Sequence, residues 1–201
     1  MFVKVTHDKK IIGVLGGSFN PVHSGHLMLA SYIAQFGPVD AVKMMLSPCN
    51  PLKRDRAMAS DADRFNMLRL ACETSAVVDA DDTELSMPRP SYTIDTLTCL
   101  QERYPEIHYK LIIGSDNWAI FNRWRASEEI LDRFGVIVYP RRDYPMGDVT
   151  DPRVEVIDAP MIDISSTFIR DSIARGKDMN YFLPPEVYKY ICQHHLYQSE
   201  L

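Results

Sequence analysis

Two histidines follow a pair of glycines near the start of the chain. Residues 16–26 read Gly-Gly-Ser-Phe-Asn-Pro-Val-His-Ser-Gly-His and come directly after the apolar run Ile11–Leu15. A Gly-Gly turn lets a ligand approach the backbone closely, and free N–H groups at the start of a following helix attract anions. His23 and His26 are three residues apart, so at a helix start both rings can reach one ligand and hydrogen-bond phosphate oxygens. The segment therefore predicts a phosphate-binding site.

Three other kinds of site fit this segment less well. Its glycines do not form the GxGxxG pattern of dinucleotide-binding folds, and no acidic residue ends the next predicted strand. No Gly-Lys-Ser/Thr triplet marks a Walker loop. A zinc site would need a third and a fourth ligand at useful spacing from His23 and His26, and the sequence offers none. Phosphate contact is the favoured interpretation, and a structural role for either histidine is the alternative.

Strands and helices alternate along the chain. Short apolar runs predict strands at 11–15, 41–46, 77–78, 109–113, 135–139 and 154–157. Helical spacing with Ser, Pro and Gly boundaries predicts helices after residue 23 and at 60–72, 93–103, 118–124, 127–134, 165–175 and 184–195. This alternation predicts an α/β fold, with a doubly wound, Rossmann-like parallel sheet and helices on both faces. We expect a single domain over residues 11–201, preceded by an N-terminal extension at 1–10.

Such a sheet binds ligands at the carboxyl ends of its strands. Gly16 and Gly114 lie at the ends of two predicted strands, and polar loops follow Leu46 and Tyr139. We expect these loops to converge on one edge of the sheet, where the predicted phosphate site lies.

The composition limits the classes of protein to consider. The formal net charge of -5 argues against a general nucleic-acid binder, so any phosphate site must be local. No apolar run approaches the ~20 residues of a membrane helix, and the N-terminus lacks a secretory signal. The four cysteines have no CxxC spacing, which favours reduced thiols. We expect a cytoplasmic protein without nucleic-acid or membrane partners.

Four separated segments resemble the signatures of the nucleotidyltransferase superfamily with the HxGH motif. They are Gly16–Leu27, the PSYTIDTL segment at 90–97, the IGSD segment at 113–116 with Trp124 after it, and the ISSTFIR segment at 164–170. Within this superfamily the chain is similar to the bacterial nicotinate-mononucleotide adenylyltransferases, over about residues 10–197 and in the same order and spacing. Four matches in order are far more specific than one loop.

The resemblance implies a reaction. These enzymes transfer the adenylyl group of ATP to nicotinate mononucleotide, which gives nicotinate adenine dinucleotide and pyrophosphate in NAD biosynthesis. The mononucleotide phosphate would attack the α-phosphorus directly and in line, and Mg²⁺ would arrive on the ATP phosphates, with no metal site in the protein. A phosphate is already a nucleophile near neutral pH. The protein therefore has to align two polyanions and neutralise charge rather than supply a strong base.

The resemblance also implies the site residues. The expected catalytic residues are His23, His26, Lys53 and Arg170. The residues expected to bind ATP are Gly16, Gly17, Ser18, Phe19, Gly114, Asp116, Ile164, Ser165, Ser166 and Thr167. Those expected to bind the mononucleotide are Asn20, Thr93 and Trp124.

The chemistry of these side chains suits the roles. Ser165 and Ser166 offer hydroxyls and helix-start N–H groups to phosphates, and Asp116 can accept hydrogen bonds from ribose hydroxyls. The indole of Trp124 can stack on a pyridine ring, and donors around Thr93 can distinguish a carboxylate from an amide.

Each role has a structural alternative. The two serines can be helix caps, Arg170 can form a surface salt bridge, Lys53 can be a solvated charge and Trp124 can belong to the core.

Several rival functions also stay open. The same fold could use nicotinamide mononucleotide, phosphopantetheine or a cytidylyltransferase substrate, or it could be a non-catalytic nucleotide-binding module. The sequence does not choose between Arg141 and Arg142 as a nucleotide contact, and it does not indicate the oligomeric state.

Overall fold

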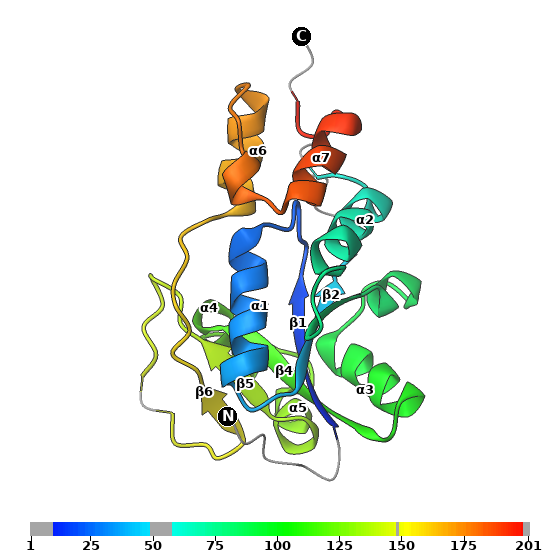
Figure 1. The fold of residues 1–201 in the computed structure, drawn as a ribbon. Coiled ribbons are helices and arrows are strands. Elements are labelled where there is room, and N and C mark those ends of the chain that lie inside the picture. The colour runs from blue at the N-terminus through cyan, green and yellow to red at the C-terminus, as the bar shows by residue number, and fades with distance from the viewer. Residues whose placement is uncertain (1–9, 49–57, 148, 199–201) are drawn as a thin grey trace.

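Six parallel strands form one sheet at the centre of the protein (Figure 1). The computed structural model describes residues 10–48, 58–147 and 149–198. The strand order is β3-β2-β1-β4-β5-β6, and all neighbouring pairs are parallel. The strands are β1 (Lys10–Gly17), β2 (Ala41–Leu46), β3 (Val78–Asp81), β4 (Ile107–Gly114), β5 (Val136–Tyr139) and β6 (Val154–Val156). This is the order of a doubly wound, Rossmann-like sheet, so the predicted fold class is confirmed.

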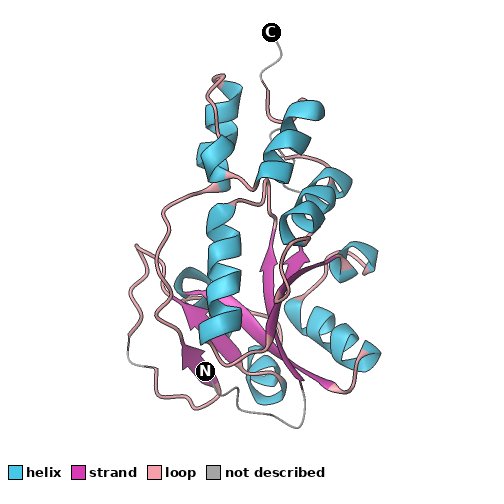
Figure 2. Ribbon diagram, in the orientation of Figure 1, coloured by secondary structure: helices cyan, strands magenta, loops and turns pink. Residues whose placement is uncertain are grey.

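Helices lie around the sheet, as expected (Figure 2). The α-helices are α1 (Ser24–Phe36), α2 (Asp61–Cys72), α3 (Thr93–Arg103), α4 (Ser115–Trp118), α5 (Ser127–Arg133), α6 (Ser166–Ala174) and α7 (Pro185–Gln193). The 3₁₀ turns are η1 (Thr83–Ser86), η2 (Phe121–Arg123) and η3 (Asn180–Phe182). Within the described ranges, no helix combines the length and the apolar character needed to cross a membrane.

Alternate strand residues serve two hydrophobic cores. Leu15 and Ile112 pack in the core that α1, α2, α6 and α7 complete. Their chain neighbours Val14, Leu111 and Ile113 pack in the core of α3 and α5 on the opposite face. Successive side chains of a strand point to opposite faces, so a parallel sheet covered on both sides needs continuous apolar runs. This is why the strands could be recognised from such runs.

The sheet reverses its direction of growth at β1. The first three strands extend one way from β1, and β4 pairs with its other edge and continues through β5 and β6. The carboxyl ends of β1 and β4 therefore flank a switch point, where such sheets leave a crevice for ligands. Gly16 and Gly17 end β1 and Gly114 ends β4, as the sequence predicted.

One predicted helix is wrong. Residues 118–124 are divided between the end of α4 and the 3₁₀ turn η2, and Trp124 is extended. Trp118, Phe121 and Trp124 are three residues apart, and their ring centroids follow at 5.2 and 5.4 Å. A spacing of three aligns side chains in a 3₁₀ helix, which has 3.0 residues per turn. The tighter turn of η2 thus keeps the two tryptophans on either side of buried Phe121.

Candidate active site

A cavity of about 560 Å³ opens at the carboxyl edge of the sheet. We call residues 18–23, between β1 and α1, the β1–α1 loop. The end of this loop, the segment after β5 and the segment before α6 contribute to the walls. The volume is typical of a small-molecule site. Six of the predicted site residues line it: His23, His26, Asp116, Ile164, Ser165 and Ser166.

The two histidines stack on each other at the start of α1. Their ring centroids are 3.7 Å apart and the ring planes differ by 26°. His23 is the N-cap of α1 and only 4% exposed, and its backbone N–H donates to Nδ1 of His26 at 3.3 Å. The backbone of the helix start therefore fixes the orientation of the His26 ring.

Both imidazoles are neutral in the free protein at pH 7. Burial, followed by the charge of Arg141, lowers the pKa of His23 to about 4. Burial also holds the pKa of His26 well below 6.5, with further contributions from His23 and Arg141. Because Nδ1 of His26 is an acceptor, its Nε2 carries the proton of the neutral ring and can donate to a phosphate oxygen.

Phe19 supports the histidine pair rather than facing the cavity. Its side chain is 2% exposed, and its ring meets that of His26 edge-on at 5.1 Å between centroids. The backbone has a positive φ of 41°. A Cβ on Gly17 would lie 2.9 Å from the Phe19 ring, so this packing requires glycine at 17. A contact of Phe19 with ATP therefore stays a prediction, and it would have to use the backbone of this residue.

A charged pair forms the wall at the end of β4. Asp116 Oδ1 lies 3.7 Å from Nε of Arg141 and accepts no hydrogen bond within the described part of the chain. Arg141 is held in place from β5 and α4, because its Nη2 donates to the Tyr139 hydroxyl at 3.1 Å and its backbone N–H to Ser115 Oγ at 2.8 Å. A Cβ on Gly114 would lie 2.4 Å from Asp116 Oδ1, so a larger residue here would displace the Asp116 carboxylate.

The two arginines that the sequence could not rank differ in their surroundings. Both line the cavity. Arg141 contacts Asp116 and lowers the pKa of both histidines, whereas Arg142 is largely exposed and pairs with Asp163 at 2.7 Å. Arg141 is thus the arginine with a defined place beside the histidines.

The start of α6 docks on the β1–α1 loop. Ser165 caps α6 and accepts from the Phe168 N–H at 3.1 Å. Ser166 Oγ donates to the Pro21 carbonyl at 2.9 Å, and Arg170 Nη1 donates to the Asn20 carbonyl at 2.8 Å. The capping alternative for Ser165 is therefore correct and remains compatible with phosphate contact. The guanidinium of Arg170 thus holds the loop in place through the Asn20 carbonyl, and its Nη2 lies 3.5 Å from Thr167 Oγ1.

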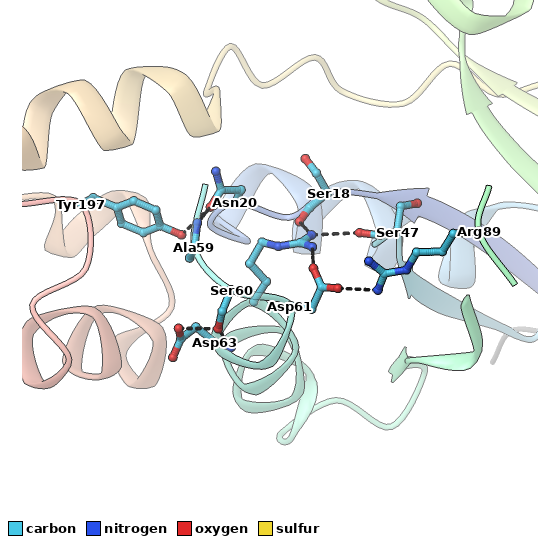
Figure 3. Close-up of polar contacts among 10 residues, drawn as sticks. Ser18, Asn20, Ser47, Ala59, Ser60, Asp61, Asp63, Arg89 and Tyr197 are labelled. Carbon is cyan, nitrogen blue, oxygen red and sulfur yellow. Dashed lines mark hydrogen bonds and ion pairs between the residues drawn. The ribbon is translucent and has the colours of Figure 1, made fainter. Parts of the chain in front are cut away.

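A buried arginine also holds the loop, and Figure 3 labels its partners Ser18, Ser47 and Asp61. Arg64 of α2 is fully buried. Its Nη1 donates to the Ser18 carbonyl at 2.5 Å and to the Ser47 carbonyl at 2.9 Å, and its Nη2 pairs with Asp61 at 2.6 Å. Asp61 also pairs with Arg89. One side chain thereby ties together the segments that follow β1 and β2.

The predicted mononucleotide residues lie outside the cavity. Thr93 begins α3, and half-buried Trp124 follows η2. The guanidinium of Arg125 is 4.6 Å from the centroid of the Tyr92 ring, which brings the segment after Trp124 against the start of α3. Asn20 is 2% exposed, and its Oδ1 accepts from the Ala59 N–H at 3.1 Å and the Tyr197 hydroxyl at 2.8 Å.

Comparisons with known proteins identify the family of this chain. A family model described as cytidylyltransferase-like matches residues 14–172. A relative from Bacteroides fragilis, named probable nicotinate-nucleotide adenylyltransferase, is 46% identical over 182 residues, 90% of each chain. A relative of the same name from Flavobacterium johnsoniae is 40% identical over 94% of this chain and 99% of its own. The chain belongs to the nicotinate-nucleotide adenylyltransferase family.

A solved structure supports the fold independently. The nicotinic acid mononucleotide adenylyltransferase of Plasmodium falciparum, solved in complex with NaAD, superposes with a TM-score of 0.74. It is 21% identical in sequence, and the match covers 94% of this chain and 97% of that one. The nicotinate-nucleotide adenylyltransferase architecture thus extends over the sheet and its surrounding helices.

The structure brings together only part of the predicted site. The cavity joins the histidines with Asp116 and the start of α6, whereas Asn20 and Arg170 make contacts that shape the loop. Lys53 lies outside the described residues. Sequence reasoning missed Arg64 and Tyr197, since neither belongs to a recognisable motif.

The neutral histidines predict how stability depends on pH. Below the ordinary pKa of 6.5 the unfolded chain binds a proton at His23, whereas the folded chain binds one only near pH 4. Acid therefore favours unfolding in this window, by up to about 3 kcal/mol for His23. We expect the free energy of unfolding in urea to fall between pH 7 and pH 5, and less so in His23→Asn. Equal pH dependence in the two proteins would contradict a neutral, buried His23.

Proposed function

We propose that this protein transfers the adenylyl group of ATP to nicotinate mononucleotide, forming nicotinate adenine dinucleotide and pyrophosphate in NAD biosynthesis. The observation that carries the proposal is the stacked pair His23 and His26 beside the start of α6, in one cavity at the switch point of the sheet. Membership of the nicotinate-nucleotide adenylyltransferase family supports the choice of substrates.

The cavity suits the triphosphate of ATP. We propose that the phosphates lie between the starts of α1 and α6, where backbone N–H groups and the dipoles of both helices favour anions. Nε2–H of His26, the Ser165 hydroxyl and the charge of Arg141 add donors and positive potential. Asp116 lines the cavity, and its Oδ1 accepts no hydrogen bond from the described residues. We propose that it accepts hydrogen bonds from the ribose hydroxyls. Lys53, in the segment after β2, is proposed as a further phosphate contact.

The chemical step needs no base from the protein. An oxygen of the mononucleotide phosphate forms a bond to the α-phosphorus while the bond from that phosphorus to the bridging oxygen of the β-phosphate breaks. The electron pair leaves with pyrophosphate, and no proton has to be moved. Negative charge grows on the α-phosphoryl oxygens and on the leaving group, so donors held in place by the loop and helix starts stabilise the transition state. Bound phosphates would also raise the pKa of both histidines toward protonation.

A divalent metal ion accompanies ATP in nucleotidyltransferases. We propose that the ion is Mg²⁺ and that it is carried by the ATP phosphates. Asp116 faces Arg141, so its carboxylate already has a cationic neighbour. Cys72, Cys99 and Cys192 are free thiols, which agrees with the proposed reducing, cytoplasmic location.

Pyrophosphate release with alternative acceptors tests the proposed function. The protein is supplied with ATP, Mg²⁺ and either nicotinate or nicotinamide mononucleotide, and the initial rates are compared. We expect rapid release with the acid and much slower release with the amide. No release with either acceptor would contradict the function, and equal rates would contradict the preference for the acid.

Trp124→Ala tests the proposed acceptor side. An indole that stacks on the pyridine ring contributes about 1 kcal/mol beyond its buried area, so we expect KM for the mononucleotide to rise about 5- to 10-fold. KM for ATP should change less than twofold. Trp118→Ala is the matched control, since Trp118 packs on the same Phe121 ring. Equal effects of the two substitutions on both KM values would assign Trp124 to the core.

A further inference from the structure

The last described residues of the chain turn back to the β1–α1 loop. After α7 ends, His195 and Tyr197 adopt positive φ angles of 51° and 64°, which are unfavourable for residues with large side chains. These turns place the Tyr197 ring against the core, and its hydroxyl donates to Asn20 Oδ1 at 2.8 Å (Figure 3). The contact joins positions 177 residues apart. Such a backbone conformation persists only where surrounding contacts hold it, and the partly buried hydrogen bond to Asn20 is one of these contacts.

Asn20 transmits this contact to the loop. Its Oδ1 accepts from both Tyr197 and the Ala59 N–H, and its carbonyl accepts from Arg170. Two donors at one oxygen fix the direction of the amide group, and through it the backbone between Phe19 and His23. Burial raises the pKa of the Tyr197 phenol, so the hydroxyl remains a donor at neutral pH.

We infer that Tyr197 is a positioning residue: its hydroxyl, acting through Asn20, holds the β1–α1 loop so that His23 and His26 face ATP. Arg64 and Arg170 bind carbonyl groups of the loop, whereas Tyr197 binds the side chain of Asn20, which is 2% exposed. The expected effect of Tyr197 on kcat rests on the proposed function, whereas its expected effect on the mobility of the loop does not.

Tyr197→Phe removes this hydroxyl and leaves the ring. The matched control is Tyr190→Phe in α7, because the Tyr190 hydroxyl donates to Asp63 at 3.0 Å and accepts from Asn66 at 3.2 Å without touching the loop. Two measurements are made on full-length protein without ligand and with substrates. They are amide hydrogen exchange of a peptide covering residues 16–27, and kcat and KM for each substrate.

We expect Tyr197→Phe to speed exchange in this peptide about 5- to 10-fold and to lower kcat by a similar factor. A change of about this size is expected when one hydrogen bond is lost. Tyr190→Phe should change neither the exchange rate of this peptide nor kcat by more than twofold. In an Asn20→Ala background, Tyr197→Phe should have no further effect on kcat. Unchanged loop exchange in Tyr197→Phe, or equal changes in the control, would overturn the inference. If the wild type shows no adenylyl transfer, the proposed function fails, and the exchange measurement still decides whether Tyr197 holds the loop.

Discussion

His26→Ala lowers kcat by about 100- to 1,000-fold, the usual loss when one donor to a developing oxyanion is removed. The reason is the fixed geometry of the ring: Nδ1 is held by the His23 backbone, so Nε2–H is aimed at the cavity without reorganisation. The free energy of unfolding should fall by only about 2 kcal/mol, since one hydrogen bond to the ring and its contacts with the His23 and Phe19 rings are lost. Steady-state kinetics and urea unfolding on the same preparation separate the two effects.

His194→Ala is the control for this loss. His194 is exposed at the end of α7 and stacks on Tyr190 at 4.1 Å between centroids, away from the cavity. Its removal should leave kcat within twofold. Near-normal turnover of His26→Ala would take this residue out of the catalytic set and leave the reaction to the helix starts and Arg141.

Arg64→Met destabilises the fold by about 3–5 kcal/mol, which is typical when one partner of a buried charged network is removed. The substitution leaves the Ser18 and Ser47 carbonyls without the Arg64 donor and removes one of the charged partners of Asp61. Urea unfolding monitored by circular dichroism measures the loss.

Arg69→Met provides the comparison for this prediction. It lies on the same helix and is exposed, so the same change of residue should cost less than about 0.5 kcal/mol. Similar losses in both variants would mean that the contacts of Arg64 with the two loops contribute little to stability.

The fold was predictable because the sheet is covered on both faces. Each of its strands carries apolar residues, and glycines or polar loops end β1 and β4 where the site forms. The one misplaced helix, at 118–124, reflects packing of Trp118 and Trp124 around Phe121, which only the folded core reveals.

Site residues could be predicted where the neighbouring sequence alone marks their position. His23, His26 and Ser165 stand at helix starts that the sequence marks clearly. Arg64 and Tyr197 give no such signal, because a buried arginine and a tyrosine near the end of the chain acquire their partners through tertiary contacts. The choice of Arg141 over Arg142 likewise depends on how the end of β5 meets Asp116.

The most direct measurement follows the adenylyl group itself. ATP labelled at the α-phosphorus is mixed with Mg²⁺, nicotinate mononucleotide and enzyme, and the labelled products and the pyrophosphate are quantified together. We predict that all the transferred label appears in nicotinate adenine dinucleotide, in a one-to-one ratio with the pyrophosphate released. Label that appears as AMP, or pyrophosphate released without labelled dinucleotide, would contradict adenylyl transfer to nicotinate mononucleotide at this site.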